Sequence, residues 1–256
     1  MSIPLGPRNF EDIFTETFRI YKKLFIKLIM IMAILGVFDE ILSFYLLPKI
    51  PLSDPETSQE LPRFWILKQL PSMFIYSILG MILTFIKGAL VTWMVSCYCL
   101  GKDAEIGQSF QFALRRFGSL AGAAILYILG VTFLFITIFG IPFSIYFLVS
   151  WGFAVQTCTL EHLGPKKSLK RSSWLVEDHW WRIVGIMLVF LLISAPIYIG
   201  FHFVPFVGKY IGAVLAGPLF VIAGILLYFN LRVRKEGYNL EKLSEELGFK
   251  PITPSL

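Results

Sequence analysis

The chain contains a stretch of 44 residues, from Phe117 to Leu160, without a single charged side chain. About 20 apolar residues are enough for a helix to cross a bilayer, so this stretch can cross, turn and cross back. Gly140 and Pro142, near its middle, are a turn signal. A soluble domain has about 25% charged residues, whereas this chain has 16% and is 56% hydrophobic. The sequence therefore predicts an integral membrane protein.

Hydrophobic segments recur along the whole chain and predict an all-α protein with six transmembrane helices. The first of them begins near Leu28 and is too long for the core of a signal peptide, so we expect it to be retained. We interpret residues 1–256 as one membrane domain that ends in a tail, 232–256. The predicted spans are 28–47, 72–100, 117–140, 141–160, 183–204 and 210–231.

Lysine and arginine are distributed unequally between the two sides that these spans define. Six spans place both termini on the same side, and 18 of the 23 basic residues fall there, against four on the other side. Lys87 lies within the second span. Because basic residues accumulate in cytoplasmic loops, we expect a multi-pass protein of the cell membrane with both termini in the cytoplasm.

The segments before the first, third and fifth spans share an amphipathic pattern. Residues 9–25 place aromatic side chains on one face and charges on the other, and Asn9 with Asp12 resembles a capping box. Residues 106–117 repeat this spacing, and residues 166–182 do so less regularly. The interpretation is an internal repeat: three hairpins, each preceded by an interfacial helix. Coincidence among amphipathic helices is the alternative.

The basic side chains of these segments suggest the bilayer itself as the partner. They could recognise anionic lipid headgroups at the cytoplasmic face, although simple anchoring of the topology explains them more economically. No nucleic-acid partner is expected, and the sequence names no protein partner.

Three charged residues fall inside predicted spans. Lys87 lies near the middle of the second span, and a charge there costs about 3 kcal/mol on insertion scales. Asp39 and Glu40 lie at a similar depth in the first span, which runs antiparallel to the second. We predict that Lys87 pairs with Asp39 or Glu40. A polar pathway or proton site is the functional interpretation, and a structural ion pair or a snorkelling lysine is the alternative.

Helix-breaking residues occupy the middle of the last two spans. Pro196 lies in the fifth span, and Gly217 and Pro218 lie in the sixth. Proline removes a helical hydrogen bond and bends the axis. Paired breaks in neighbouring spans can mark a transporter site, but more often they only shape the bundle.

The three cysteines, Cys97, Cys99 and Cys158, fall near predicted cytoplasmic ends of spans. Their spacing could form a soft metal site, but packing as small apolar residues is the simpler interpretation. Motifs of metalloproteases, serine hydrolases and phosphate-binding loops are absent from the sequence. We therefore expect neither enzymatic activity nor a cofactor.

The segment from Leu227 to Glu241, LYFNLRVRKEGYNLE, resembles the C-terminal signature of prokaryotic proteins related to the membrane domain of glycerophosphoryl diester phosphodiesterase. Residues 14–25 and 168–182 are similar to that family as well. In enzymes with this domain, catalysis resides in a separate soluble barrel, which this chain lacks. The resemblance therefore implies fold and topology rather than activity.

Three functions are consistent with these patterns. The leading hypothesis is a non-catalytic membrane scaffold or accessory subunit. The alternative is a transporter or channel for a small solute, ion or lipid, in which Lys87, Asp39 and Glu40 act together with the fifth and sixth helices. A membrane-embedded lipid enzyme ranks last. A polar cavity that reaches Lys87 from solvent would favour transport, and a dry, packed interior would favour a scaffold.

Overall fold

The computed structural model describes residues 5–47, 62–204 and 208–249, and these form helices without a strand. Residues 48–61, between the first two predicted spans, and the last residues of the tail, 250–256, lie outside the described residues. The prediction of an all-α protein is confirmed. The elements are α1 (Phe10–Leu46), α2 (Pro62–Cys99), α3 (Ile106–Arg115), α4 (Phe117–Ile136), η1 (Ile138–Gly140), α5 (Ile141–Ser150), α6 (Ala154–Thr159), α7 (Pro165–Val176), η2 (Glu177–His179), α8 (Trp180–His202), α9 (Gly208–Glu236) and α10 (Leu240–Glu246).

Helix α1 joins the first predicted interfacial segment and the first predicted span into one helix of 37 residues. Its beginning agrees with the sequence, because the Asp12 carboxylate accepts a hydrogen bond from the Asn9 N–H at 2.9 Å. The prediction of a separate interfacial helix is wrong for this unit. No glycine or proline lies between Phe10 and Lys27, so nothing in the chain interrupts the backbone hydrogen bonds.

A short helix does precede a long apolar helix in the other two units. Helix α3 ends at Arg115 and α4 begins at Phe117, while α7 is separated from α8 by the short 3-10 helix η2. Leu114 and Phe117 are exposed, as the membrane-facing side of an interfacial segment requires.

The fourth predicted span, 141–160, is not one helix. The chain turns at η1 as predicted, but α5 has only 10 residues, and residues 151–153 separate it from the six residues of α6. Ten residues rise about 15 Å, half the thickness of the hydrocarbon core. The side chain of Ser172 stabilises the interruption, because its hydroxyl donates to the Ser150 carbonyl at 2.7 Å and accepts from the Phe153 N–H at 3.1 Å.

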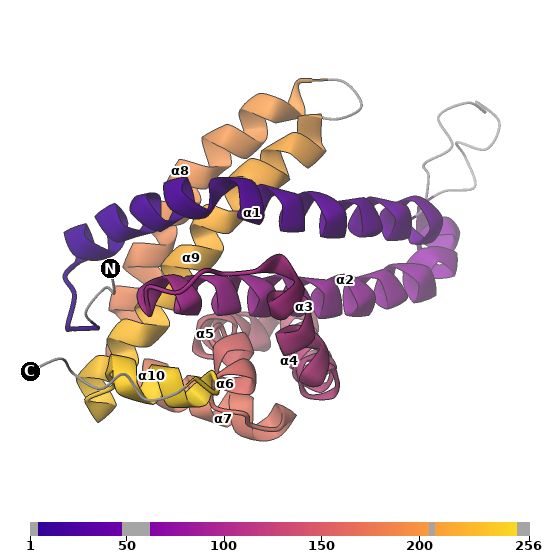
Figure 1. Ribbon diagram of the computed structural model, residues 1–256. Helices are drawn as coiled ribbons and strands as arrows, with labels where there is room; N and C mark the ends of the chain where they lie inside the picture. The colour runs from indigo at the N-terminus through magenta and orange to yellow at the C-terminus, as the bar shows by residue number, and fades with distance from the viewer. Residues whose placement is uncertain (1–4, 48–61, 205–207, 250–256) are drawn as a thin grey trace, which may run out of the picture.

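Helix α9 is the central helix of the molecule and contacts α1, α2, α7 and α8. Gly212 permits the close approach of α8, because a Cβ at this position would lie 3.1 Å from the backbone of Tyr198. Figure 1 shows α1 with α2 and α8 with α9 as two antiparallel pairs whose tips diverge.

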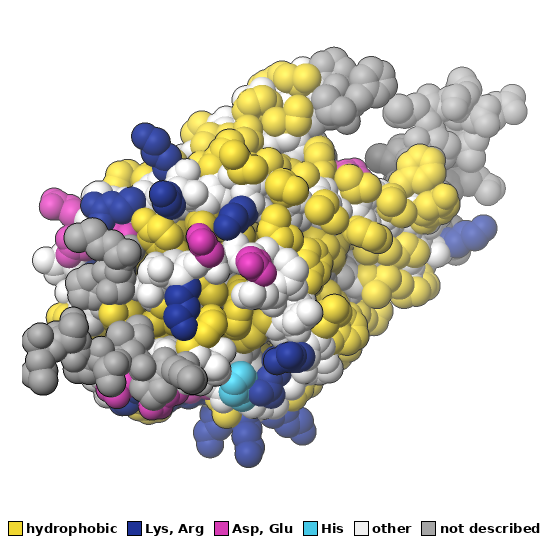
Figure 2. All heavy atoms as spheres, in the orientation of Figure 1, with side chains coloured by type: hydrophobic (Ala, Val, Ile, Leu, Met, Phe, Trp, Pro, Cys, Tyr) yellow, Lys and Arg dark blue, Asp and Glu magenta, His cyan; other side chains and the backbone are white. Residues whose placement is uncertain are grey.

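Four helical stretches in the described residues are long and apolar enough to cross a membrane. The predicted first and fourth spans are not among these four. The start of α1 and helix α10 lie toward the same end of the molecule (Figure 1), and in Figure 2 most charged side chains gather toward that end while hydrophobic ones cover most of the rest of the visible face. The four stretches are Lys68–Cys99, Phe117–Ile136, Pro165–His202 and Tyr210–Glu236.

Candidate functional site

A small polar cavity lies between the two diverging helix pairs and contains all three charged residues that the sequence singles out. Its volume is about 200 Å³. Side chains from α1, α2, α8 and α9 line it, so no single element forms the site. We name it the polar cleft, and its lining is Met32, Gly36, Asp39, Glu40, Tyr76, Lys87, Tyr198, Tyr210, Ala213 and Val214.

Lys87 and Asp39 form the ion pair that their depths predict. The Lys87 ammonium lies 3.4 Å from the Asp39 Oδ2 atom. The pairing with Asp39 is therefore confirmed, and Glu40, one residue further along α1, lines the same cavity. The pair is only partly shielded, since 18% of the lysine side chain and 37% of the aspartate side chain are exposed. A pair at this distance and exposure is weak compared with a direct, buried salt bridge.

Tyrosine hydroxyls supply the other polar groups of the cleft, and the sequence analysis did not single them out. Tyr76 lines the cleft from α2, beside Asp39. Tyr210 from α9 donates to the Ala33 carbonyl, which fixes its ring against α1. Gly36 makes room for this ring, because a Cβ there would lie 2.6 Å from the Tyr210 Cε2 atom. The only sequence signal for this contact was the pair of residue types, a glycine (Gly36) in the first predicted span and a tyrosine (Tyr210) at the start of the sixth.

The predicted helix breaks do not interrupt their helices. Pro196 lies inside α8, and Gly217 and Pro218 lie inside α9, which both continue past them. Proline removes only one hydrogen bond, and a packed helix accommodates this loss by local adjustment. None of the three residues lines the polar cleft.

The cysteines are buried and free. The Cys158 thiol donates to the Ser168 hydroxyl at 3.0 Å. Within the described part of the chain, no group of three or more His, Cys, Asp or Glu side chains is placed to hold a metal ion.

A second group of charges, which sequence reasoning missed, joins the C-terminal tail to the segment before α8. Arg171 pairs with Glu161 at 2.7 Å and also with Glu236, while Arg232 pairs with Glu236 at 3.2 Å and with Glu246 at 2.8 Å. These five residues form what we name the charged network. Each arginine has two carboxylate partners, and only 7% of the Arg232 side chain is exposed.

Two tyrosines complete the charged network. The Tyr228 hydroxyl donates to Glu161 at 2.8 Å, and the Tyr238 hydroxyl donates to Glu246 at 2.6 Å. The Arg232 guanidinium lies 3.8 Å from the centre of the Tyr238 ring. Burial raises the pKa of the Glu246 carboxyl, and the charge of Arg232 opposes this shift. Four of these network residues fall in the segment Leu227 to Glu241 that carries the family resemblance, so its motif has a structural role here.

The fold and the polar cleft define an α-helical protein with helices able to span a membrane. No protein family, curated protein or solved structure matches the chain. The relationship to the phosphodiesterase membrane domain therefore stays a hypothesis.

Proposed function

We propose that this chain is a non-catalytic, multi-pass membrane protein that binds a small polar solute or an ion in the polar cleft, as a transporter or channel does. The observation that carries this proposal is the convergence of Asp39, Glu40, Lys87 and three tyrosines on one cavity between four helices. A polar cavity at Lys87 is the feature that distinguishes transport from a purely structural role.

The energetic cost of placing Lys87 and Asp39 at membrane depth indicates that these charges serve a function. A charged side chain at membrane depth costs about 3 kcal/mol on insertion scales. A partly exposed ion pair contributes only about 0–1 kcal/mol to stability, so the Lys87–Asp39 pair is a poor structural device. Asp39 and Lys87 at 3.4 Å recover little of this cost. We infer that the charges are retained for what they bind.

The size of the polar cleft restricts the class of ligand. Sites for drug-sized molecules have volumes of about 300–1,000 Å³, whereas the cleft measures about 200 Å³. A hydrated ion, a proton relay through several water molecules or a very small solute fits this space. A whole lipid does not.

The proposal includes six crossings in three hairpins, the fourth made by α5 and α6 together across their interruption, with both termini in the cytoplasm. Support for α1 as a span comes from apolar side chains exposed at helical spacing, which are Met30, Ile34, Val37, Phe38 and Ile41. Cysteines introduced at Lys102 and at Thr137 of a cysteine-free variant would test the orientation with an impermeant thiol reagent on intact cells. We expect labelling at position 137 only, and labelling at position 102 would reverse the topology.

Transport is tested with the purified protein in liposomes that contain a pH-sensitive dye. Under imposed proton, Na⁺ or K⁺ gradients, we expect flux above that of empty liposomes for at least one ion. Lys87→Met and Asp39→Asn should each reduce this flux at least tenfold. Thr84→Ala is the matched control, because Thr84 lies on the same helix one turn away, is exposed and does not line the cleft.

A scaffold or accessory subunit is the second candidate. The observation in its favour is the dense packing of the half of the molecule near the termini, where the charged network joins α7, α9 and α10. Absence of flux for ions and for small solutes would contradict the transport proposal. If Lys87→Met then left folding unchanged, the scaffold would be the better explanation.

A further inference from the structure

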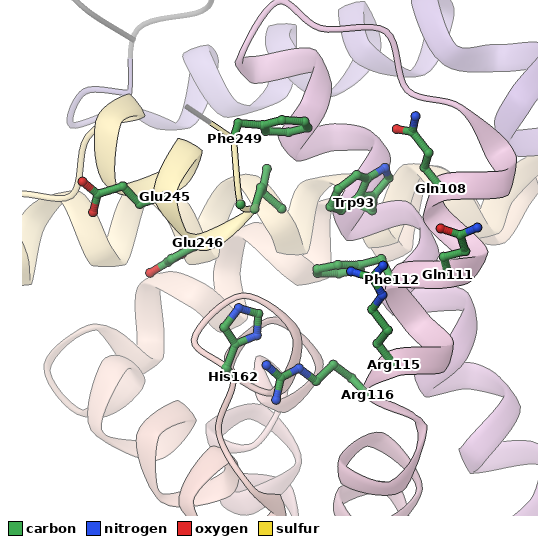
Figure 3. Close-up of a pocket in the computed structure, with 12 residues that line it drawn as sticks. Trp93, Gln108, Gln111, Phe112, Arg115, Arg116, His162, Glu245, Glu246 and Phe249 are labelled. Carbon is green, nitrogen blue, oxygen red and sulfur yellow. The ribbon is translucent and has the colours of Figure 1, made fainter. Parts of the chain in front are cut away.

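A second, larger cavity opens near the termini, away from the polar cleft. Its volume is about 620 Å³, within the range of sites that bind small molecules. It lies between α3, the last turns of α2, the loop before α7 and the residues that follow α10 (Figure 3). Its lining is Trp93, Gln108, Gln111, Phe112, Arg115, Arg116, His162, Glu245, Glu246, Leu247, Gly248 and Phe249.

One wall of this cavity is aromatic. The Trp93 ring lies 4.7 Å from the Phe112 ring and 5.8 Å from the Phe249 ring, measured between centroids. Trp93 is 8% exposed, and its indole Nε1 atom is buried without a hydrogen-bond partner among the described residues. A buried donor without a partner costs about 1–3 kcal/mol, and a ligand group that accepted this hydrogen bond would remove that cost.

Another part of the lining is basic. Arg115 and Arg116 are consecutive residues at the end of α3, and Figure 3 shows Arg116 extending toward His162. Neither arginine has an ion pair within residues 5–47, 62–204 and 208–249.

The acidic residues of the lining do not neutralise these arginines. Glu246 is already paired with Arg232 and hydrogen-bonded by Tyr238. Glu245 is exposed and points away from Arg115 and Arg116 in Figure 3. The cavity therefore presents two uncompensated guanidinium groups beside an aromatic wall.

We propose that this cavity is a phosphate-binding site, in which Arg115 and Arg116 bind the phosphate of an anionic phospholipid headgroup. Arginine matches phosphate by paired N–H···O bonds, and the aromatic wall accommodates the apolar part of the molecule. The exposed Leu114 and Phe117 flank the two arginines and would place the site at the membrane interface. A soluble phosphate ester shares this chemistry and is the competing source. The proposal does not depend on the function of the polar cleft.

The test measures binding to the full-length protein in neutral detergent by isothermal titration calorimetry. The probes are short-chain phosphatidic acid, the matching phosphatidylcholine, glycerol 3-phosphate and inorganic phosphate. We expect phosphatidic acid to bind at least tenfold more tightly than the other three. Combined Arg115→Gln and Arg116→Gln should raise its Kd at least tenfold.

Lys166→Gln combined with Lys167→Gln is the matched control, because these two residues are also consecutive and basic but are exposed outside the cavity. It should change the Kd less than twofold. Trp93→Phe, which keeps the ring and removes the N–H, should weaken binding a few-fold, and circular dichroism verifies folding of every variant.

Two results would overturn the proposal: no binding of any phosphate-bearing probe, or equal loss of affinity in the arginine and lysine variants. Equal affinity for glycerol 3-phosphate and phosphatidic acid, with the same dependence on the arginines, would overturn the lipid source and assign the site to a soluble phosphate ester.

Discussion

The polar cleft and the charged network both contain ion pairs, but they compensate charge to different degrees. In the cleft, Lys87 lies 3.4 Å from one carboxylate, and 37% of that Asp39 side chain is exposed. In the network, Arg232 has two carboxylate partners and an aromatic ring, and only 7% of its side chain is exposed. A buried charge with two oppositely charged partners, such as Arg232, indicates a structural role. A longer, partly exposed pair beside a cavity, such as Lys87 with Asp39, indicates a binding site.

The largest expected effect is that of Arg232→Met. Removing this guanidinium leaves Glu246 without its cationic partner and Glu236 with Arg171 alone, and loss of one partner of a buried pair costs about 3–5 kcal/mol. The free energy of unfolding in detergent, measured by denaturant titration, should fall by that amount. Lys170→Met, at an exposed lysine beside Arg171, should change it by less than about 0.5 kcal/mol. A similar small change for Arg232→Met would mean that the network does not stabilise the fold.

An intermediate effect is expected from Gly36→Ala. The new Cβ would lie 2.6 Å from the Tyr210 ring, whose hydroxyl is held by the Ala33 carbonyl, so the ring must move. Such overpacking costs about 1–3 kcal/mol, measurable by thermal unfolding. Gly80→Ala on α2 is the control, because nothing lies within 4 Å of its Cβ and alanine favours a helix by about 1 kcal/mol. Equal behaviour of the two variants would show that Tyr210 does not pack on Gly36.

The smallest effect on stability is expected from Lys87→Met. Partly exposed pairs contribute about 0–1 kcal/mol, so the free energy of unfolding should change by no more than that, while the flux described above is lost. Lys87→Met should therefore reduce flux but hardly change stability, whereas Arg232→Met should reduce stability. A loss of 3 kcal/mol or more would make the Lys87 pair structural and remove the main support for transport.

The sequence predicted well what depends on local composition. The charge-free stretch marks α4, whose beginning at Phe117 and following turn at Gly140 both agree with the structure. The pairing of Lys87 with Asp39 was also predictable, because two antiparallel helices joined in sequence place residues of equal depth side by side. The cost of a charge in the membrane then requires a partner.

The fourth span shows where local composition fails. Residues 141–160 carry no charge, yet α5 ends at Ser150, because Ser172 of α7 satisfies the backbone groups that the interruption frees. The sequence of residues 141–160 does not indicate that the Ser172 hydroxyl of another helix will bind its backbone. Pro196 and Pro218 lie inside helices that continue past them, so local sequence also did not decide where these two helices end.

The sequence by itself thus determined that this is a helical protein suited to a membrane, because hydropathy and charge act within single segments. Only the tertiary structure decided which charges meet. Arg171 and Glu236 are 65 positions apart, and the cavity beside Arg115 and Arg116 closes against residues that follow α10. Such contacts depend on how helices pack over long sequence separations, and no local pattern in the chain encodes them.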